Sequence, residues 1–396
     1  MKIIIGGERM KKNIKSLSFI LLACFIFISI PFNAKASNVS DETLNFVKEQ
    51  ITSLSDSLEE SNWNDSSEIY NVIPLYDLDD IINGYIYEIR TNGDDAGFIQ
   101  VDISTGENIV SSFAFEGTHA VNKMLEKYQE QTRNININKI VYLGGYSYFI
   151  KNNETSIAKS VSGSLNLFDL NSSKYVSEDI TNLKSNYNEK VNLKKKSARN
   201  YSLADDGIST LSTVVKKYVP NANYDILVEM DDFAGKKIKD WTITNHCSPT
   251  AGLNIVKYWA LKRGVSQLYY SGDSWMFNSL AVNMKTNINN GTIRDDIYTG
   301  LWNYGANTRG VTPSGGDKIT SGVTYDKAKT ILDSGVPFIV SVDNYGGTIG
   351  GHSVACFGYY ENVSNYLIIN NGWNKSWTFE SFNNLNIDRY TYSRWN

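Results

Sequence analysis

A marked helix start at Ser248-Pro249 constrains the fold more than any other feature of the sequence. Proline is tolerated at the first helical position, because its missing N–H would have no partner there. Helical spacing then continues over 249–263, and Gly264 can end the helix. The expected buried face consists of Ala251, Ile255, Tyr258 and Trp259. A helix of this kind, followed by strand-like segments, predicts an α+β module.

The strand-like segments lie in the C-terminal part of the chain. Apolar runs of strand length cover 336–342, 352–360 and 365–370, and a second helix fits 325–334. We therefore expect residues 215–396 to form one α+β domain with a helical half and an antiparallel β half.

Residues 37–182 have the pattern of another α+β module. Ser40 can cap an amphipathic helix over 40–58, and a second helix fits 119–131. Between the two helices, turn signals at Asn92-Gly93 and Ser104-Thr105-Gly106 separate three strand-like runs. Further strands are predicted at 139–150 and 157–168.

Residues 183–214 differ from both modules. Large apolar residues are sparse there, and Lys194-Lys195-Lys196-Ser197-Ala198-Arg199-Asn200 is basic. An exposed segment of this kind is easily cut by proteases. We predict a linker at 183–214 with a processing site near its basic run.

The N-terminus resembles a secretory signal. Basic residues precede the apolar stretch Leu17–Phe32, and Ala34-Lys35-Ala36 fits a cleavage site. Residues 1–36 are therefore the predicted signal peptide, with an uncleaved anchor as the alternative. We expect a secreted or cell-surface protein with no membrane segment after cleavage.

Composition excludes several classes of partner and cofactor. The net charge of −4 gives no basic footprint for nucleic acid. The three histidines are scattered, and no Asp/Glu/His cluster has the spacing of metal ligands. We expect no metal and no cofactor.

Three distant residues form a candidate catalytic set. Cys247 precedes the predicted helix, where the positive end of the helix dipole lowers a thiol pKa. His352 follows Gly350-Gly351 and opens a strand, and Asn371 ends the next strand. A thiol, an imidazole and a carboxamide in this order suit a nucleophile, its base and an orienting group. Trp373 would shield the imidazole–amide bond from water.

Two simpler interpretations of Cys247 remain open at this point. A free cysteine is often a small buried apolar residue. The other interpretation is a disulfide between Cys247 and Cys356. The two contacts nearly exclude each other, because His352 and Cys356 lie about 13 Å apart along one strand.

The motifs of residues 215–396 resemble the papain-like cysteine peptidases. Thr244 to Ala251 is similar to the nucleophile helix of streptopain and of bacterial peptidases of the double-glycine leader-processing type. Asn371-Gly372-Trp373 resembles the family's asparagine–small–tryptophan motif, and Trp377 matches a later tryptophan. The resemblance implies that Cys247 is the nucleophile, His352 the base and Asn371 the orienting residue. It also implies an N-terminal pro-domain that inhibits the enzyme.

The sequence departs from the family at the oxyanion hole. Six positions before the cysteine, where the family has a glutamine, this chain has Trp241. The indole of Trp241 or the amide of Asn245 could serve as the donor beside the Cys247 N–H. Loss of one such donor costs about 10²–10³ in rate.

These observations predict a secreted cysteine endopeptidase made as a zymogen, acting on peptide or protein substrates. One alternative is a weak or inactive papain-like binding protein, which the departure at Trp241 favours. Another is an amidase or acyltransferase that uses the same three residues.

Overall fold

The structure, a computed structural model, describes most of the chain from Val39 onward. The described residues are 39–132, 137, 139–152, 166–176, 180–204, 214–235, 237–238, 241–242, 245–286, 291–343 and 351–396. The predicted signal peptide at 1–36 lies outside them. Residues 36–396 cluster as one compact unit. We use "N-terminal module" for residues 39–204 and "C-terminal module" for residues 214–396.

None of the helices formed by the described residues has the length and apolar character needed to cross a bilayer.

The N-terminal module begins with the predicted amphipathic helix, α1 (Asp41–Ser57). The Ser40 side chain accepts a hydrogen bond from the Thr43 N–H at 3.1 Å, which satisfies one of the free donors of the first turn. The buried face includes Val47, Ile51 and Leu54. The helix predicted at 40–58 is therefore confirmed.

Four antiparallel strands and a second helix follow α1. They are β1 (Ser67–Tyr76), β2 (Ile82–Thr91), β3 (Asp94–Asp102), β4 (Ile109–Ala114) and α2 (Ala120–Thr132). Only Asn92 and Gly93 separate β2 from β3, and both have positive φ values, 55° and 88°. A two-residue hairpin turn of this kind favours Asn-Gly, because both residues must adopt left-handed backbone.

The strand predicted at 139–150 is two strands. β5 (Ile140–Tyr142) and β6 (Tyr148–Asn152) pair antiparallel, and Gly144 and Gly145 turn the chain between them with φ of 105° and 52°. Two successive residues with positive φ interrupt a strand, and glycine adopts that backbone at little cost. We call residues 143–147 the Tyr146 turn. The module continues with β7 (Asn166–Asp169) and β8 (Lys174–Tyr175), so most of the strand predicted at 157–168 falls outside the described residues.

The segment expected to be a linker starts as a helix, α3 (Ile180–Ala204). Leu183 and Tyr187 are buried in a small apolar cluster with residues of β5, β6 and β7. Lys194, inside the predicted processing region, pairs with Asp102 at 2.7 Å. Two buried side chains one helical turn apart are enough to hold one face of a polar helix on the module. The domain boundaries and the cut itself stay predictions.

The C-terminal module joins a set of helices to an antiparallel sheet. The main helices are α4 (Cys247–Lys257), α5 (Asp273–Asn283), α6 (Arg294–Asn303) and α7 (Tyr325–Asp333). The strands are β9 (Val215–Tyr218), β12 (Gly315–Ile319), β13 (Phe338–Val342), β14 (His352–Glu361), β15 (Asn365–Asn370), β16 (Thr378–Ser381) and β17 (Ile387–Arg394). The short segments are η1 (Tyr224–Ile226), η2 (Met230–Phe233), η3 (Tyr258–Lys262), η4 (Ser266–Leu268), η5 (Tyr304–Thr308), β10 (Lys237–Ile238) and β11 (Trp241–Thr242). The architecture is α+β, as the sequence predicts.

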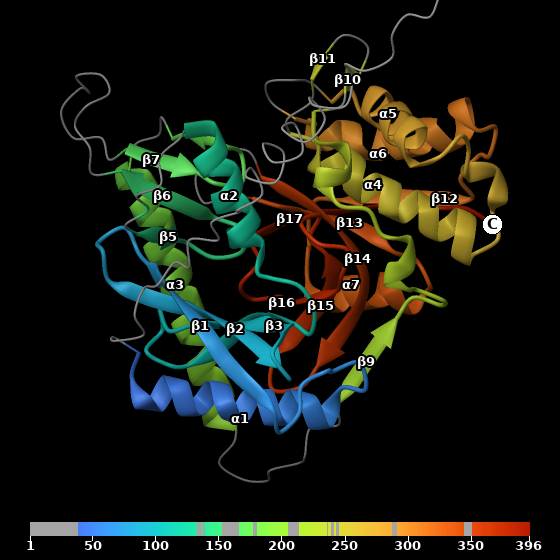
Figure 1. The fold of residues 1–396 in the computed structure, drawn as a ribbon. Helices are drawn as coiled ribbons and strands as arrows, with labels where there is room; N and C mark the ends of the chain where they lie inside the picture. Colours follow the sequence, from blue (N-terminus) through green and yellow to red (C-terminus); the bar gives the residue numbers. More distant parts are fainter. Residues whose placement is uncertain are drawn as a thin grey trace, which may run out of the picture. The chain divides into compact units, whose positions relative to one another are not determined.

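One sheet runs through both modules. Its order is β12-β17-β13-β14-β15-β16-β4-β3-β2-β1-β5-β6-β7-β8, with β9 paired to β14. The modules meet where β16 pairs antiparallel with β4, at Phe379↔Phe113 and Glu380↔Ser112. In Figure 1 the red strands β13–β16 lie between the blue and green N-terminal elements and the yellow and orange helices α4–α6.

Aromatic side chains from both modules pack across this junction. The rings of Phe113 and Phe379 stack with centroids 4.5 Å apart and planes 9° apart. Tyr360 and Tyr366 of the C-terminal module belong to the N-terminal core, and Tyr146 of the N-terminal module belongs to the C-terminal core. Burying one large apolar side chain contributes about 1.5–3 kcal/mol, so this shared core resists separation of the modules.

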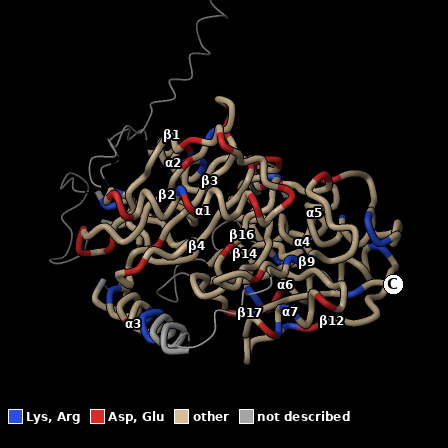
Figure 2. The backbone as a smooth tube through the Cα atoms, turned by 90° about the horizontal axis from the view of Figure 1, so that it is seen from below, with Lys and Arg blue, Asp and Glu red and all other residues tan. Residues whose placement is uncertain are grey.

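Charged residues of both signs are interspersed along the backbone. Figure 2 shows Lys and Arg positions next to Asp and Glu positions in both modules, with a basic stretch on α3. This distribution agrees with the small net charge of −4.

Candidate functional site

Cys247 is the first residue of α4, and it is partly exposed. The N-cap is His246, whose carbonyl accepts the Thr250 N–H at 3.1 Å, so the helix starts two residues earlier than Ser248 as cap would require. Pro249 still lies in the first turn, where no helical N–H is needed. The thiol therefore sits at the positive end of the helix, where an anion is stabilised.

His352 is brought to Cys247 because α4 packs against β14. His352 opposes Val342 at the first position of β14 and is buried. Its Nε2 lies 2.7 Å from the main-chain oxygen of Asn371. A carbonyl oxygen only accepts hydrogen bonds, so Nε2 carries a proton and Nδ1 is left for the thiol.

The Cys247 thiol is poised to ionise. Burial alone raises its pKa, but the hydrogen bond and the charge of His352 oppose this effect. Hydrogen bonds from the Ser353 N–H and from Ser248 add to the opposition, and the pKa falls below the ordinary 9.0. The thiolate is the nucleophilic form of cysteine, so these contacts raise the reactivity of the sulfur near neutral pH.

Asn371 holds the imidazole through its backbone. The sequence led us to expect the Asn371 carboxamide as the partner of His352, whereas the 2.7 Å bond goes to the main-chain oxygen. The carboxamide is used inside its own loop: Oδ1 accepts the Trp373 N–H at 2.9 Å, and Nδ2 donates to Thr378 at 3.2 Å. The side chain thus fixes the turn that aims the carbonyl, with Gly372 at φ 81°.

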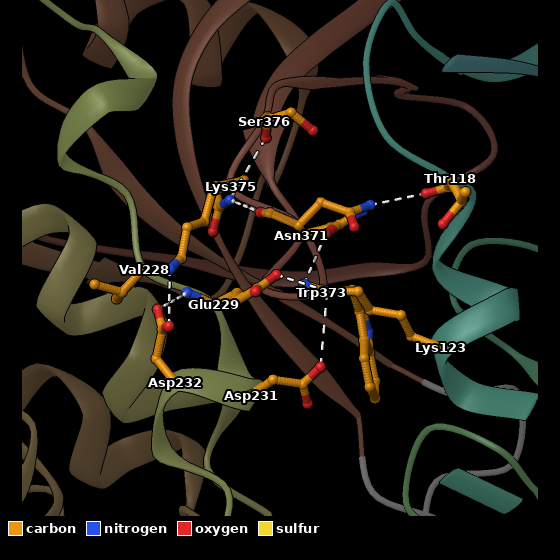
Figure 3. A network of polar contacts seen from close by, with 12 residues as sticks. Thr118, Lys123, Val228, Glu229, Asp231, Asp232, Asn371, Trp373, Lys375 and Ser376 are labelled. Atoms are coloured by element: carbon orange, nitrogen blue, oxygen red, sulfur yellow. Dashed lines mark hydrogen bonds and ion pairs between the residues drawn. The ribbon is translucent and has the colours of Figure 1, made fainter. Parts of the chain in front are cut away.

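Trp373 lies next to the catalytic candidates. Its ring is buried and inclined by 28° to the His352 ring, with centroids 6.3 Å apart. Figure 3 shows the loop around Asn371 and Trp373 beside Lys123 of α2 and Asp231 of η2. Lys123 pairs with Glu229 at 2.7 Å and approaches Asp231 at 3.7 Å. These ion pairs link the N-terminal module to the segment that packs on this loop.

Of the two candidate oxyanion donors, Trp241 and Asn245, the structure describes the side chain of Asn245 only. The backbone of Trp241 belongs to β11, and its indole lies outside the described part of the structure. Asn245 is partly buried, two residues before Cys247, and the backbone of Gly291 packs closely on it. The Cys247 N–H, free at the helix start, can serve as the second donor.

The N-terminal module contributes two residues that the sequence did not point to. The Tyr146 ring lies edge-on to His352, with centroids 5.0 Å apart and planes at 68°. The ammonium group of Lys127 lies 5.8 Å from the Trp373 ring centroid. Burial lowers the Lys127 pKa, and the charges of Asp231 and Cys247 partly offset that effect. The Gly144-Gly145 pair was the available signal, because two adjacent glycines mark a tight turn.

The second cysteine has a different environment. Cys356 is fully buried in β14, and burial raises its pKa well above the ordinary value. Its Sγ contacts the Gly358 carbonyl at 3.5 Å. Both Cys247 and Cys356 are free, so the disulfide interpretation is wrong for this structure.

Among the residues that the structure describes, no group of three or more His, Cys, Asp or Glu side chains is arranged to hold a metal ion.

Comparison with known families points to the cysteine peptidases. A family model described as Peptidase_C39 like family matches residues 222–394, a stretch that contains Cys247, His352 and Asn371. The match supports a relationship to C39-type cysteine peptidases, and it suggests that the chain is a cysteine peptidase. The helices and the mostly antiparallel sheet are consistent with a papain-like peptidase fold. Among curated proteins, no relative matches the chain.

Proposed function

We propose that this protein is a secreted cysteine endopeptidase made as an inactive precursor. Cys247 is the nucleophile, His352 is the general base, and Asn371 orients the imidazole. The contact between the Cys247 thiol and His352 at the start of α4 carries the proposal. The likeness to streptopain and the role of 37–182 as a pro-domain belong to the same proposal.

The reaction follows from the positions of the protons. His352 takes the thiol proton at Nδ1, and the thiolate attacks the carbonyl carbon of a peptide bond. The Cys247 N–H and a side-chain donor, Asn245 or Trp241, hold the oxyanion. The imidazolium then protonates the leaving amine. Water, deprotonated by the same imidazole, hydrolyses the thioester and restores the thiol.

The N-terminal module keeps the precursor inactive in this proposal. Tyr146 contacts the imidazole, and the Lys123 ion pairs lie over the neighbouring loop. A peptide cannot reach His352 from the side that Tyr146 fills. Cleavage within 183–214 then frees the module to move.

Thiol labelling tests the nucleophile. A thiol-directed epoxide is expected to label the wild-type protein and Cys356→Ala, the matched control, but not Cys247→Ala. Casein turnover is expected to follow the same pattern. Labelling that persists in Cys247→Ala would refute the assignment. Labelling without any peptide-bond turnover would favour the acyltransferase or amidase alternative.

Mass spectrometry of the secreted protein tests the precursor. Mature wild type is expected to begin within 183–214, whereas Cys247→Ala accumulates as a chain beginning at Ser37. Equal trimming of both proteins would assign the cut to another protease. A chain that keeps residues 1–36 would contradict the predicted signal peptide.

A further inference from the structure

The Tyr146 turn packs closely beside His352. Tyr146 is buried at 3% exposure, although it stands on a turn. A methyl group on Gly145 would lie 3.6 Å from both the Val342 side chain and the Asn384 carbonyl. The turn therefore rests on the end of β13 and on the segment before β17. It occupies the side of the site formed by the imidazole.

An acidic side chain, that of Glu380, lies at the far end of the space that Tyr146 fills. Glu380 of β16 is buried, and its Oε1 accepts hydrogen bonds from Tyr146 at 3.1 Å and from Ser112 at 2.9 Å. Both donors are neutral hydroxyls of the N-terminal module. Burial raises the Glu380 pKa to about 8, and the two hydroxyl bonds only partly oppose this shift. Within the described residues, the hydrogen-bond partners of the Glu380 side chain are neutral hydroxyls, and a buried carboxyl with neutral partners is costly to retain unless it has a role.

We propose that the space filled by Tyr146 is a substrate subsite, and that Glu380 selects a tyrosine side chain there by accepting a hydrogen bond from its hydroxyl. This inference rests on the proposed peptidase function and names its substrate class. Peptides with tyrosine next to the cleaved bond would take the position that Tyr146 holds in the precursor.

The contacts favour a phenol over the two obvious competitors. Phenylalanine would keep the edge-on contact with His352 but leave the Glu380 acceptor unpaired, and sites built around such a bond discriminate strongly against the analogue that lacks it. Lysine could pair with the carboxylate. Its ammonium group, however, would share the space with the imidazolium that forms during the reaction, and like charges at close range repel.

The test uses the processed secreted protein and matched peptides. Each set places Tyr, Phe or Lys at one position on either side of the cleaved bond. At one position we expect kcat/KM for Tyr to exceed that for Phe by about 10- to 100-fold, as for a buried acceptor that Phe leaves unpaired. In Glu380→Leu the ratio is expected to fall below about 3-fold. The near-isosteric Glu380→Gln keeps an acceptor oxygen, and an intermediate ratio is expected.

Each outcome decides something different. Equal turnover of Tyr and Phe peptides at every position, a preference for Lys, or a Tyr preference that survives in both Glu380 variants would overturn the subsite. Loss of all turnover together with loss of thiol labelling would instead refute the proposed function, and the substrate class with it.

A binding measurement reads the pocket without catalysis. Full-length Cys247→Ala/Tyr146→Ala lacks the phenol that fills the space, and p-cresol is expected to bind it at least about 10-fold more tightly than toluene. The difference is expected to vanish when Glu380→Leu is added. Equal binding of the two probes would overturn the hydrogen-bonding role of Glu380.

Discussion

Two regions of the C-terminal module each hold a cysteine, and their surroundings give the two thiols opposite properties. At the start of α4, Cys247 has an imidazole, a hydroxyl and a free N–H within reach, and its pKa is lowered. In the middle of β14, Cys356 has apolar neighbours and one carbonyl, and its pKa is raised. Burial acts on both thiols in the same direction. The difference teaches that the partners of a sulfur, more than its burial, decide whether it reacts.

Replacing each cysteine by alanine should show the largest difference between the two regions. Cys247→Ala is expected to lower kcat by about 10⁵–10⁶, as for loss of other catalytic nucleophiles. Cys356→Ala is expected to cost about 1 kcal/mol of stability and leave kcat within about 2-fold, because only packing is lost. Peptide turnover and urea unfolding measure the two effects. A comparable loss of kcat in both variants would mean that the comparison is wrong.

Removing the imidazole should make the two thiols more alike. In His352→Ala the desolvation of Cys247 is no longer opposed by its largest favourable partner, so the pKa rises. The thiolate fraction falls as the pKa rises, so alkylation by iodoacetamide at pH 7 is expected to slow by more than about 10-fold.

The pH profile of alkylation shows in which direction the Cys247 pKa is shifted. The rate follows the thiolate fraction, so it rises with pH and has its midpoint below pH 9.0 in wild type, since the Cys247 pKa lies below that value. In His352→Ala the rate should still be climbing there. Cys356 is expected to react only after denaturation. A wild-type midpoint at or above 9.0 would contradict the lowering of the Cys247 pKa by His352.

Opening the Tyr146 contact should affect Cys247 alone. Removal of one edge-on aromatic contact weakens the covering by about 0.5–1.5 kcal/mol, so Tyr146→Ala is expected to speed labelling of the precursor by a peptide epoxide up to about 10-fold. Tyr146→Phe keeps the ring and serves as the control. Labelling kinetics of uncut precursor measure the effect. Identical rates in wild type and Tyr146→Ala would argue against an inhibitory role for this turn.

The smallest expected effect comes from Ser248. Ser248→Ala removes the smallest of the contacts that lower the Cys247 pKa, so that pKa should rise slightly and alkylation at pH 7 should slow by about 3-fold. The Cys356 rate in the unfolded chain is the internal reference. A change as large as that of His352→Ala would show that Ser248 does more than donate to the thiol.

Much of the local structure could be read from the chain. The cap at Ser40, the turn at Asn92-Gly93 and the helix that begins near Pro249 depend on neighbouring residues, so their patterns predict them. The start of α4 was predicted two residues too late, because His246 caps through its backbone and such a cap has no side-chain signature.

Contacts across the chain could be predicted only in part. The order of Cys247, His352 and Asn371 suggested that the three meet, and the structure brings the first two into contact. The order of the residues did not reveal that the main-chain oxygen of Asn371 accepts the hydrogen bond from the imidazole. A backbone carbonyl is present at every position, so no residue type marks it.

The sequence by itself determined where helices and turns begin, which thiol lies at a helix start, and the α+β class, because these depend on spacing over a few residues. Tertiary structure alone decided that α3 packs on the N-terminal module, that β4 pairs with β16, and that Tyr146 reaches His352 and Glu380. These contacts join residues far apart along the chain. They form only when many apolar side chains are buried together, and no local pattern encodes that condition.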